Sequence, residues 1–363
     1  MSHQAILDAA RKQAHTTLKH ILKTSCIDVS EPGKYFYSAA SRLASEQDKE
    51  SVDFLIQYGA NLNFIAQGAA RGGHRAYAEE LCAQGASINW LARGAAQGGH
   101  RAYAEELRAQ GACIKWIVMS AAISGHLAYA EELRLQANTH FIAWGAAVGG
   151  HRVYAEELRA RGASIDWLAM GAAHGGHRAY AEELRAQGAS VNWLANGAAE
   201  GGHRAYAEEL RAQGASINFI AQGAAQGGHR AYAEELRTQA NINEIARSAA
   251  IGGHRAYAEE LRAQGACINW IVTGAAIARH PAYAEELRAQ GANINEIALG
   301  AELGGNLNNE KSVFIYLMDF KESAVRNEMI AAILNHDNIP EVSKQITRAA
   351  QNRCSHVLSF KNE

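Results

Sequence analysis

The chain has 363 residues, of which 48% are hydrophobic and 20% charged, with a formal net charge of −2. The net charge is close to zero, without the excess of basic residues that is typical of nucleic-acid-binding proteins. No apolar stretch approaches the ~18 residues of a transmembrane helix. The polar N-terminus has no apolar segment of the kind found in signal peptides. The five cysteines show no Cys-x-x-Cys spacing, so we expect reduced thiols in a cytoplasmic protein.

Repetition dominates the sequence. Alanine supplies about a fifth of the residues, and there are 34 glycines but only 3 prolines, which favours short, closely packed helices. The segment GGHRAYAEELRAQGA recurs with few changes. Its histidine returns every 25 or 26 residues, as His74, His100, His126, His151, His177, His203, His229, His254 and His280. Because one such unit cannot bury its own apolar face, the repetition predicts an all-α solenoid of stacked helix-turn-helix repeats.

We expect an N-terminal helical cap over residues 1–34, the repeat solenoid over 35–305 and a C-terminal helical cap over 306–363. The first cap is predicted as one amphipathic helix over 1–30, which ends where Glu31-Pro32-Gly33 interrupts it.

The repeat around His100 shows the expected fold of one unit. A first helix is predicted over 88–97, Gly98-Gly99 forms the turn, and a second helix runs from His100 to Gln110. Gly111 occupies the position of a helix C-cap glycine. Two units lack this glycine, so we expect local breaks in curvature near Ala137 and Ala240.

The second helix carries an apolar stripe and a charged face. Tyr103, Ala104 and Leu107 form the stripe. Glu105 is spaced to pair with Arg101 at i−4 and with Arg108 at i+3. Residues such as Glu106 are expected to lie partly buried beside the arginine of the next repeat, in a ladder of Arg–Glu pairs between repeats.

The C-terminal cap contains most of the large apolar residues outside the repeats. We expect an apolar helix over 313–318, followed by helices near 322–335 and 340–356, which are separated by the segment that ends at Pro340.

Each unit resembles the ankyrin repeat. The resemblance rests on the run from Ala95-Ala96 to Gly98-Gly99-His100 and on Gly111-Ala112, which follows eleven residues after the histidine. An asparagine or its substitute stands at the fourth place from that glycine. The unit over 35–63, with Gly59-Ala60-Asn61-Leu62-Asn63, is the nearest match. The units here are about seven residues shorter than the ankyrin repeat of about 33, in the stretch that would carry the β-hairpin. The resemblance implies an array without hairpins, whose first helices line a concave groove. Arrays of this kind also resemble effectors that intracellular bacteria such as Legionella deliver into host cells.

Comparison of the repeats with each other indicates where function lies. Counted from the histidine, position +16 is mostly aromatic and positions +19 and +23 change most. They are spaced i, i+3, i+7 and so share one face of the first helix, which we call the first-helix strip. The strip supplies the candidate partner-binding residues, which are Trp90, Arg93, Trp116, Met119, Ile123, Trp144, Val148, Trp167, Met170, His174, Trp193, Asn196, Glu200 and Trp270.

The central members of the strip, from Trp116 to Met170, are mostly apolar, and an apolar patch of that size usually marks a partner site. Two other interpretations stay open. The tryptophans can instead fill the space left by the missing hairpin and belong to the core. Positions +19 and +23 can vary because exposed residues drift after duplication.

The histidine register does not predict a metal site. Adjacent layers lie roughly 8–10 Å apart, whereas the ligands of one zinc ion must lie within ~2.1 Å of it. We expect each histidine to form a hydrogen bond with a neighbouring loop.

No nucleophile–base constellation, phosphate loop or dinucleotide fingerprint occurs, so we expect no enzyme activity, catalytic residue, metal or cofactor. The expected function is a monomeric scaffold that binds a protein partner, and neither nucleic acid nor membrane, through the groove. Two alternatives stay open, namely a self-associating structural array and a targeting arm for an activity in the C-terminal tail.

Overall fold

A computed structural model describes residues 41, 43–57, 61–304, 313, 316–317, 320 and 323–359. The predicted helix over 1–30 and most of the one over 313–318 lie outside this described part. The chain divides into two units, Met1–Tyr232 and Ala233–Glu363. All regular structure in the described residues is helical, and they include no strand. The prediction of an all-α solenoid is confirmed.

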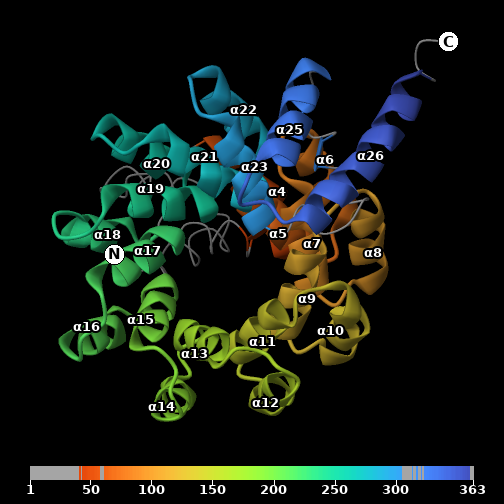
Figure 1. Cartoon of the computed structure of the whole chain (residues 1–363). Coiled ribbons are helices and arrows are strands. Elements are labelled where there is room, and N and C mark those ends of the chain that lie inside the picture. The colour runs from red at the N-terminus through yellow and green to blue at the C-terminus, as the bar shows by residue number, and fades with distance from the viewer. Residues whose placement is uncertain are drawn as a thin grey trace. The chain divides into compact units, whose positions relative to one another are not determined.

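Each repeat contributes two helices. The first helices are α5 (Leu62–Arg71), α7 (Ile88–Gln97), α9 (Ile114–Ile123), α11 (Thr139–Val148), α13 (Ile165–His174), α15 (Val191–Glu200), α17 (Ile217–Gln226), α19 (Ile242–Ile251), α21 (Ile268–Ile277) and α23 (Ile294–Leu303). The second helices are α6 (Arg75–Ala83), α8 (Arg101–Ala109), α10 (Leu127–Leu133), α12 (Arg152–Ala160), α14 (Arg178–Ala186), α16 (Arg204–Ala212), α18 (Arg230–Arg237), α20 (Arg255–Ala263) and α22 (Pro281–Ala289). The helix α4 (Lys49–Gln57) precedes them. Within the first unit, the first helices form an inner row and the second helices an outer row (Figure 1).

Small residues set the spacing between layers, because within each unit one first helix packs directly on the next. Ala95 and Ala96 of α7 are buried, as are the equivalent alanine pairs of α5, α9, α11, α13, α15, α17, α19 and α21. Gly94 faces the preceding helix so closely that a Cβ there would lie 2.1 Å from the carbonyl oxygen of Gln67. The richness in alanine and glycine is therefore a consequence of close helix packing.

The repeated histidines tie neighbouring layers together. Nε2 of His177 lies 3.0 Å from the carbonyl oxygen of Val148, which belongs to the preceding first helix. Because a carbonyl can only accept, Nε2 carries the hydrogen. The same bond recurs at 2.9–3.3 Å for the other histidines of this register in the first unit. The predicted hydrogen bond is confirmed for these residues, but most of its acceptors are the last residue of a first helix and not a loop residue.

The ends of the second helices also match the sequence. Gly111 has a φ of +113°, a left-handed conformation that glycine adopts without strain. Where the glycine is missing, the 3₁₀ turn η1 (Arg134–Gln136) follows α10 and leads to Ala137. At the other short unit, α18 ends at Arg237. The breaks in curvature at these joints remain a prediction.

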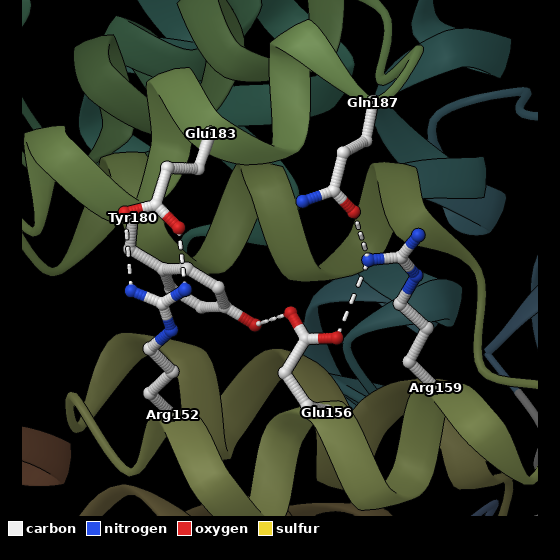
Figure 2. Close-up of polar contacts among 6 residues, drawn as sticks. All are labelled: Arg152, Glu156, Arg159, Tyr180, Glu183 and Gln187. Atoms are coloured by element: carbon white, nitrogen blue, oxygen red, sulfur yellow. Dashed lines mark hydrogen bonds and ion pairs between the residues drawn. The ribbon is translucent and has the colours of Figure 1, made fainter.

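A ladder of polar contacts runs along the outer row (Figure 2). Arg152 of α12 pairs with Glu183 of α14 through both carboxylate oxygens, and its guanidinium lies 5.0 Å from the ring centroid of Tyr180. The Tyr180 hydroxyl donates to Glu156 at 2.8 Å. Arg159 of α12 donates to both Glu156 and Gln187.

This Arg–Glu ladder was predicted, but two details were wrong. Glu106 pairs with Arg75 of the preceding repeat, not of the next, although its side chain is partly buried as expected, with 48% exposure. Arg101 reaches Glu132 of the next repeat instead of Glu105 of its own helix. Glu105 does pair with Arg108, as expected. Arg101 favours the partner in the next layer because the bidentate contact there engages both carboxylate oxygens of Glu132, whereas an i, i+4 contact would engage one oxygen of Glu105.

In the described part of the second unit after α23, the structure gives the bounds of two helices. They are α25 (Ser323–Asn335), which packs on α23, and α26 (Glu341–Ser359), which packs on α25. Their bounds agree with the predicted helices near 322–335 and 340–356. Tyr316 and Phe320 are fully buried, with ring centroids 5.5 Å apart. Among the described residues, no helix combines the length and apolar character needed to cross a membrane.

Candidate partner-binding surface

The first-helix strip lies on the side of the inner row that faces away from the second helices. On α7, Leu91 and Ala92 are fully buried, while Trp90, Arg93 and Gln97 stay partly exposed. The helical repeat of 3.6 residues places these two sets on opposite faces. Of the candidate residues, all but Trp270 belong to the first unit, on α7, α9, α11, α13 and α15. Trp270 lies on α21 of the second unit.

The centre of the strip is a self-packed apolar cluster. Met119, Trp144 and Met170, one from each of three successive layers, are buried, with 5%, 7% and 8% exposure. Four partly buried residues pack against them, namely Trp116, Ile123, Val148 and Trp167. The predicted apolar patch therefore exists, but its +19 side chains cover each other, and the surface that remains accessible is supplied mainly by the +16 and +23 positions.

The +16 aromatics form a continuous ladder over α11 to α17. The ring centroids of Phe141 and Trp167 lie 5.4 Å apart, those of Trp167 and Trp193 6.5 Å, and those of Trp193 and Phe219 5.3 Å. Trp193 is 38% exposed. In the second unit, Trp270 is 36% exposed. The tryptophans thus range from buried at Trp144 to exposed at Trp193, so neither the core interpretation nor the groove interpretation covers them all.

A cation lies at the α7 end of the strip. The Arg93 guanidinium lies 5.0 Å from the ring centroid of Trp90 and 5.4 Å from that of Trp116. Its Nε is buried without a hydrogen-bond partner. Burial lowers the pKa of Arg93 to about 10, and the negative charge of Glu200 opposes that shift. Arg93 and Glu200 form no ion pair among the described contacts, so the charge of Arg93 is not neutralised by a direct contact.

An acceptor lies at the α15 end. The side chain of Glu200 is 11% exposed, and its Oε1 accepts a hydrogen bond from Gln226 at 2.9 Å. Its Oε2 lies 3.6 Å from Nδ1 of His174. The imidazole of His174 meets Trp144 edge-on, with centroids 5.2 Å apart. Asn196 donates to the carbonyl oxygen of Phe219 at 2.9 Å, so its amide already serves the packing of α15 on α17.

Sequence reasoning missed Lys115, which precedes Trp116 on α9. Its ammonium nitrogen lies 5.0 Å from the ring centroid of Trp116 and 4.8 Å from that of Phe141. Burial lowers its pKa. A signal was present in the sequence, because the other repeats have Asn, Asp or His at this +15 position and Lys115 alone is a cation there.

The described residues include no group of three or more His, Cys, Asp or Glu that could hold a metal ion. Cys82, Cys113 and Cys267 are free thiols. No protein-family model matches the chain, and no curated protein matches it either. The resemblance to the ankyrin repeat therefore stays a prediction from its motifs.

Proposed function

We propose that this chain is a non-enzymatic scaffold that binds a protein partner through the first-helix strip of its first unit. The observation that carries the proposal is the contrast between the two rows. The outer row repeats the same residues at each layer, whereas the strip changes at almost every layer and presents tryptophans at its surface. The repeated residues suffice for most of the stacking, so the varied residues that keep exposed surface are available for recognition.

The chemistry of the strip supports this proposal. Trp167 and Trp193 are stacked at an interplanar angle of 18° and both keep exposed surface. Large rigid aromatics bury much area at low cost in conformational entropy, which is why tryptophan and arginine are enriched at binding hot spots. The proposal includes action as a monomer in the cytoplasm. Membership of a shortened ankyrin class, and delivery into a host cell, rest on the sequence resemblance alone.

The test is a binding measurement with a matched control. Peptides selected from a random library on the purified chain are labelled, and their affinity is measured by fluorescence anisotropy. The Trp167→Ala/Trp193→Ala variant should bind them about 30-fold more weakly, as expected for loss of about 2 kcal/mol at a hot spot. The control is Leu135→Ala/Val153→Ala, because these apolar residues are 86% and 76% exposed but lie on η1 and α12, outside the strip.

Equal affinity of the wild type and the strip variant would contradict the proposal, provided that circular dichroism shows unchanged helicity. Light scattering over a range of concentrations separates the scaffold from a self-associating array. A constant monomer mass is expected.

A further inference from the structure

The aromatic rings of the strip differ in whether a cation of the same chain contacts them. Arg93 lies beside Trp90 and Trp116, with its guanidinium carbon 5.0 and 5.4 Å from their ring centroids. The ammonium nitrogen of Lys115 lies 5.0 Å from the centroid of Trp116 and 4.8 Å from that of Phe141. Each of these three rings therefore has a positive charge of this chain within cation–π distance.

Trp167 and Trp193, on α13 and α15, have no such cation. Among the described residues, no lysine or arginine lies over either ring, and both rings keep exposed surface. Trp193 is the more open of the two, with 38% exposure. The +19 residue that contacts Trp116 from the preceding layer is Arg93, whereas the equivalent residue before Trp193 is Met170, which has no charge. This pair of rings therefore lacks the cation that its counterparts contact.

A carboxylate occupies the place beside these rings that a cation occupies on α9. Asp166 has the same +15 position on α13 that Lys115 has on α9. Its Oδ1 accepts a hydrogen bond of 2.7 Å from the backbone N–H of Ser190, the residue directly before α15. The carboxylate therefore lies beside the first turn of α15, which carries Trp193.

The negative charge of Asp166 exceeds what the contact between layers requires. In the next layer, Asn192 accepts the equivalent hydrogen bond from Ser216, also at 2.7 Å, so an uncharged oxygen makes the same link. No other repeat has a carboxylate at +15. Asp166 is only partly buried, and its Oδ2 has no hydrogen-bond partner among the described residues. This oxygen is therefore available to a donor from outside the chain.

The other charges of the strip lie apart from this place. Glu200 follows Trp193 by seven residues, so it lies about 10 Å further along α15. Its side chain is 11% exposed and accepts from Gln226, and its negative charge already acts on Arg93. Lys115 belongs to α9, three layers before α15. The exposed charge beside Trp193 is therefore that of Asp166.

We propose that the partner presents a basic segment to this surface, with an arginine or lysine side chain placed against Trp193 and donating a hydrogen bond to Oδ2 of Asp166. This inference rests on the proposed function, since it specifies what the strip recognises. The partner's cation would contact Trp193 as Lys115 contacts Trp116 within the chain. The carboxylate adds a charge-assisted hydrogen bond, which is about twice as strong as a neutral one. An arginine suits both contacts, because its planar guanidinium stacks on aromatic faces and donates in its own plane.

The test compares the peptides that the full chain and two variants select from one random library. Asp166→Asn removes the charge but keeps the oxygen that accepts from Ser190, as Asn192 does in its own layer. Glu157→Gln is the matched control on α12. It makes the same change of charge in the outer row, and Glu157 has no ion pair among the described residues, since the arginine expected in the preceding repeat is replaced by Leu127. The wild type and the control should enrich Arg and Lys next to apolar residues, and Asp166→Asn should lose that enrichment.

Affinity gives the second measurement, by fluorescence anisotropy of a selected basic peptide. It should bind Asp166→Asn about tenfold more weakly than the wild type, and the difference should vanish when its Arg and Lys are replaced by Gln. Peptides without basic enrichment, or with equal enrichment on all three proteins, overturn the inference. If such peptides still depend on Trp167 and Trp193, the proposed function survives. If selection yields no peptide that depends on these tryptophans, both are refuted.

Discussion

The close approach of the layers makes Gly197 a sensitive position. It lies on α15, opposite the carbonyl group of Met170 on α13. A Cβ at this position would lie 2.1 Å from that oxygen and 2.9 Å from its carbon. Contacts below 3.0 Å essentially never occur for a real Cβ, and both atoms that would be displaced belong to helical backbone. Gly197→Ala therefore forces the two helices apart by roughly 1 Å in a closely packed interior.

The size of the effect follows from two opposing terms. Overpacking of this kind costs about 3 kcal/mol. Alanine recovers about 1 kcal/mol because it is the better helix former. We expect Gly197→Ala to lower the free energy of unfolding by about 2 kcal/mol, measured by urea denaturation with circular dichroism and tryptophan fluorescence recorded together.

Ser120 supplies the matched control, because it occupies the same +20 position in α9. Its Cβ is already accommodated there, and its hydroxyl is buried without a hydrogen-bond partner. Ser120→Ala should be neutral or slightly stabilising, since it removes an unsatisfied polar group. If Gly197→Ala is as harmless as Ser120→Ala, the claim that backbone approach sets the layer spacing is refuted.

Three further predictions concern the outer row. Tyr180→Phe should lower the free energy of unfolding by about 1 kcal/mol, because it removes the hydrogen bond to Glu156. Tyr103→Phe should leave the free energy of unfolding unchanged, because the buried hydroxyl of Tyr103 has no hydrogen-bond partner. Equal losses for the two variants in urea denaturation would contradict this. Arg101→Gln breaks an ion pair whose side chains are 56% and 51% exposed, so its cost should stay within about 0.5 kcal/mol, and a larger loss would show that the ladder is a major source of stability. Burial raises the pKa of Tyr77 and Tyr103 to about 12, so above pH 10 the unfolded chain binds fewer protons than the folded chain. The thermal midpoint of unfolding should therefore decrease as the pH rises from 10 to 12. A midpoint that stays constant over this range would exclude the pKa shift.

Much of the fold was predictable from residue spacing. The helix over 88–97 and the turn at Gly98-Gly99 were placed correctly, because a motif repeated nine times averages out the ambiguity of any single segment. The hydrogen-bonding role of the histidines followed from the distance between layers. The partner of Glu106 was predicted wrongly, because spacing along one helix does not say which end of the neighbouring helix comes close.

The candidate site was predictable only in part. Periodicity placed Trp144, Trp167 and Trp193 on one face but could not rank their exposure, which depends on the side chains of adjacent layers. Trp144 is enclosed by Met119 and Met170, whereas Trp193 stacks on Trp167, meets Phe219 edge-on and stays partly open to solvent. Lys115 was missed because it lies at a position where the other repeats need an acceptor.

The sequence by itself determined that this protein is a stack of paired helices, because the period, the small residues and the turn glycines act locally and repeat. Only the tertiary structure decided which side chains cover each other and which cations contact aromatic rings. Those properties arise between layers, from contacts 23 to 31 residues apart, where the packing of each side chain depends on the size and charge of its neighbour in the next repeat.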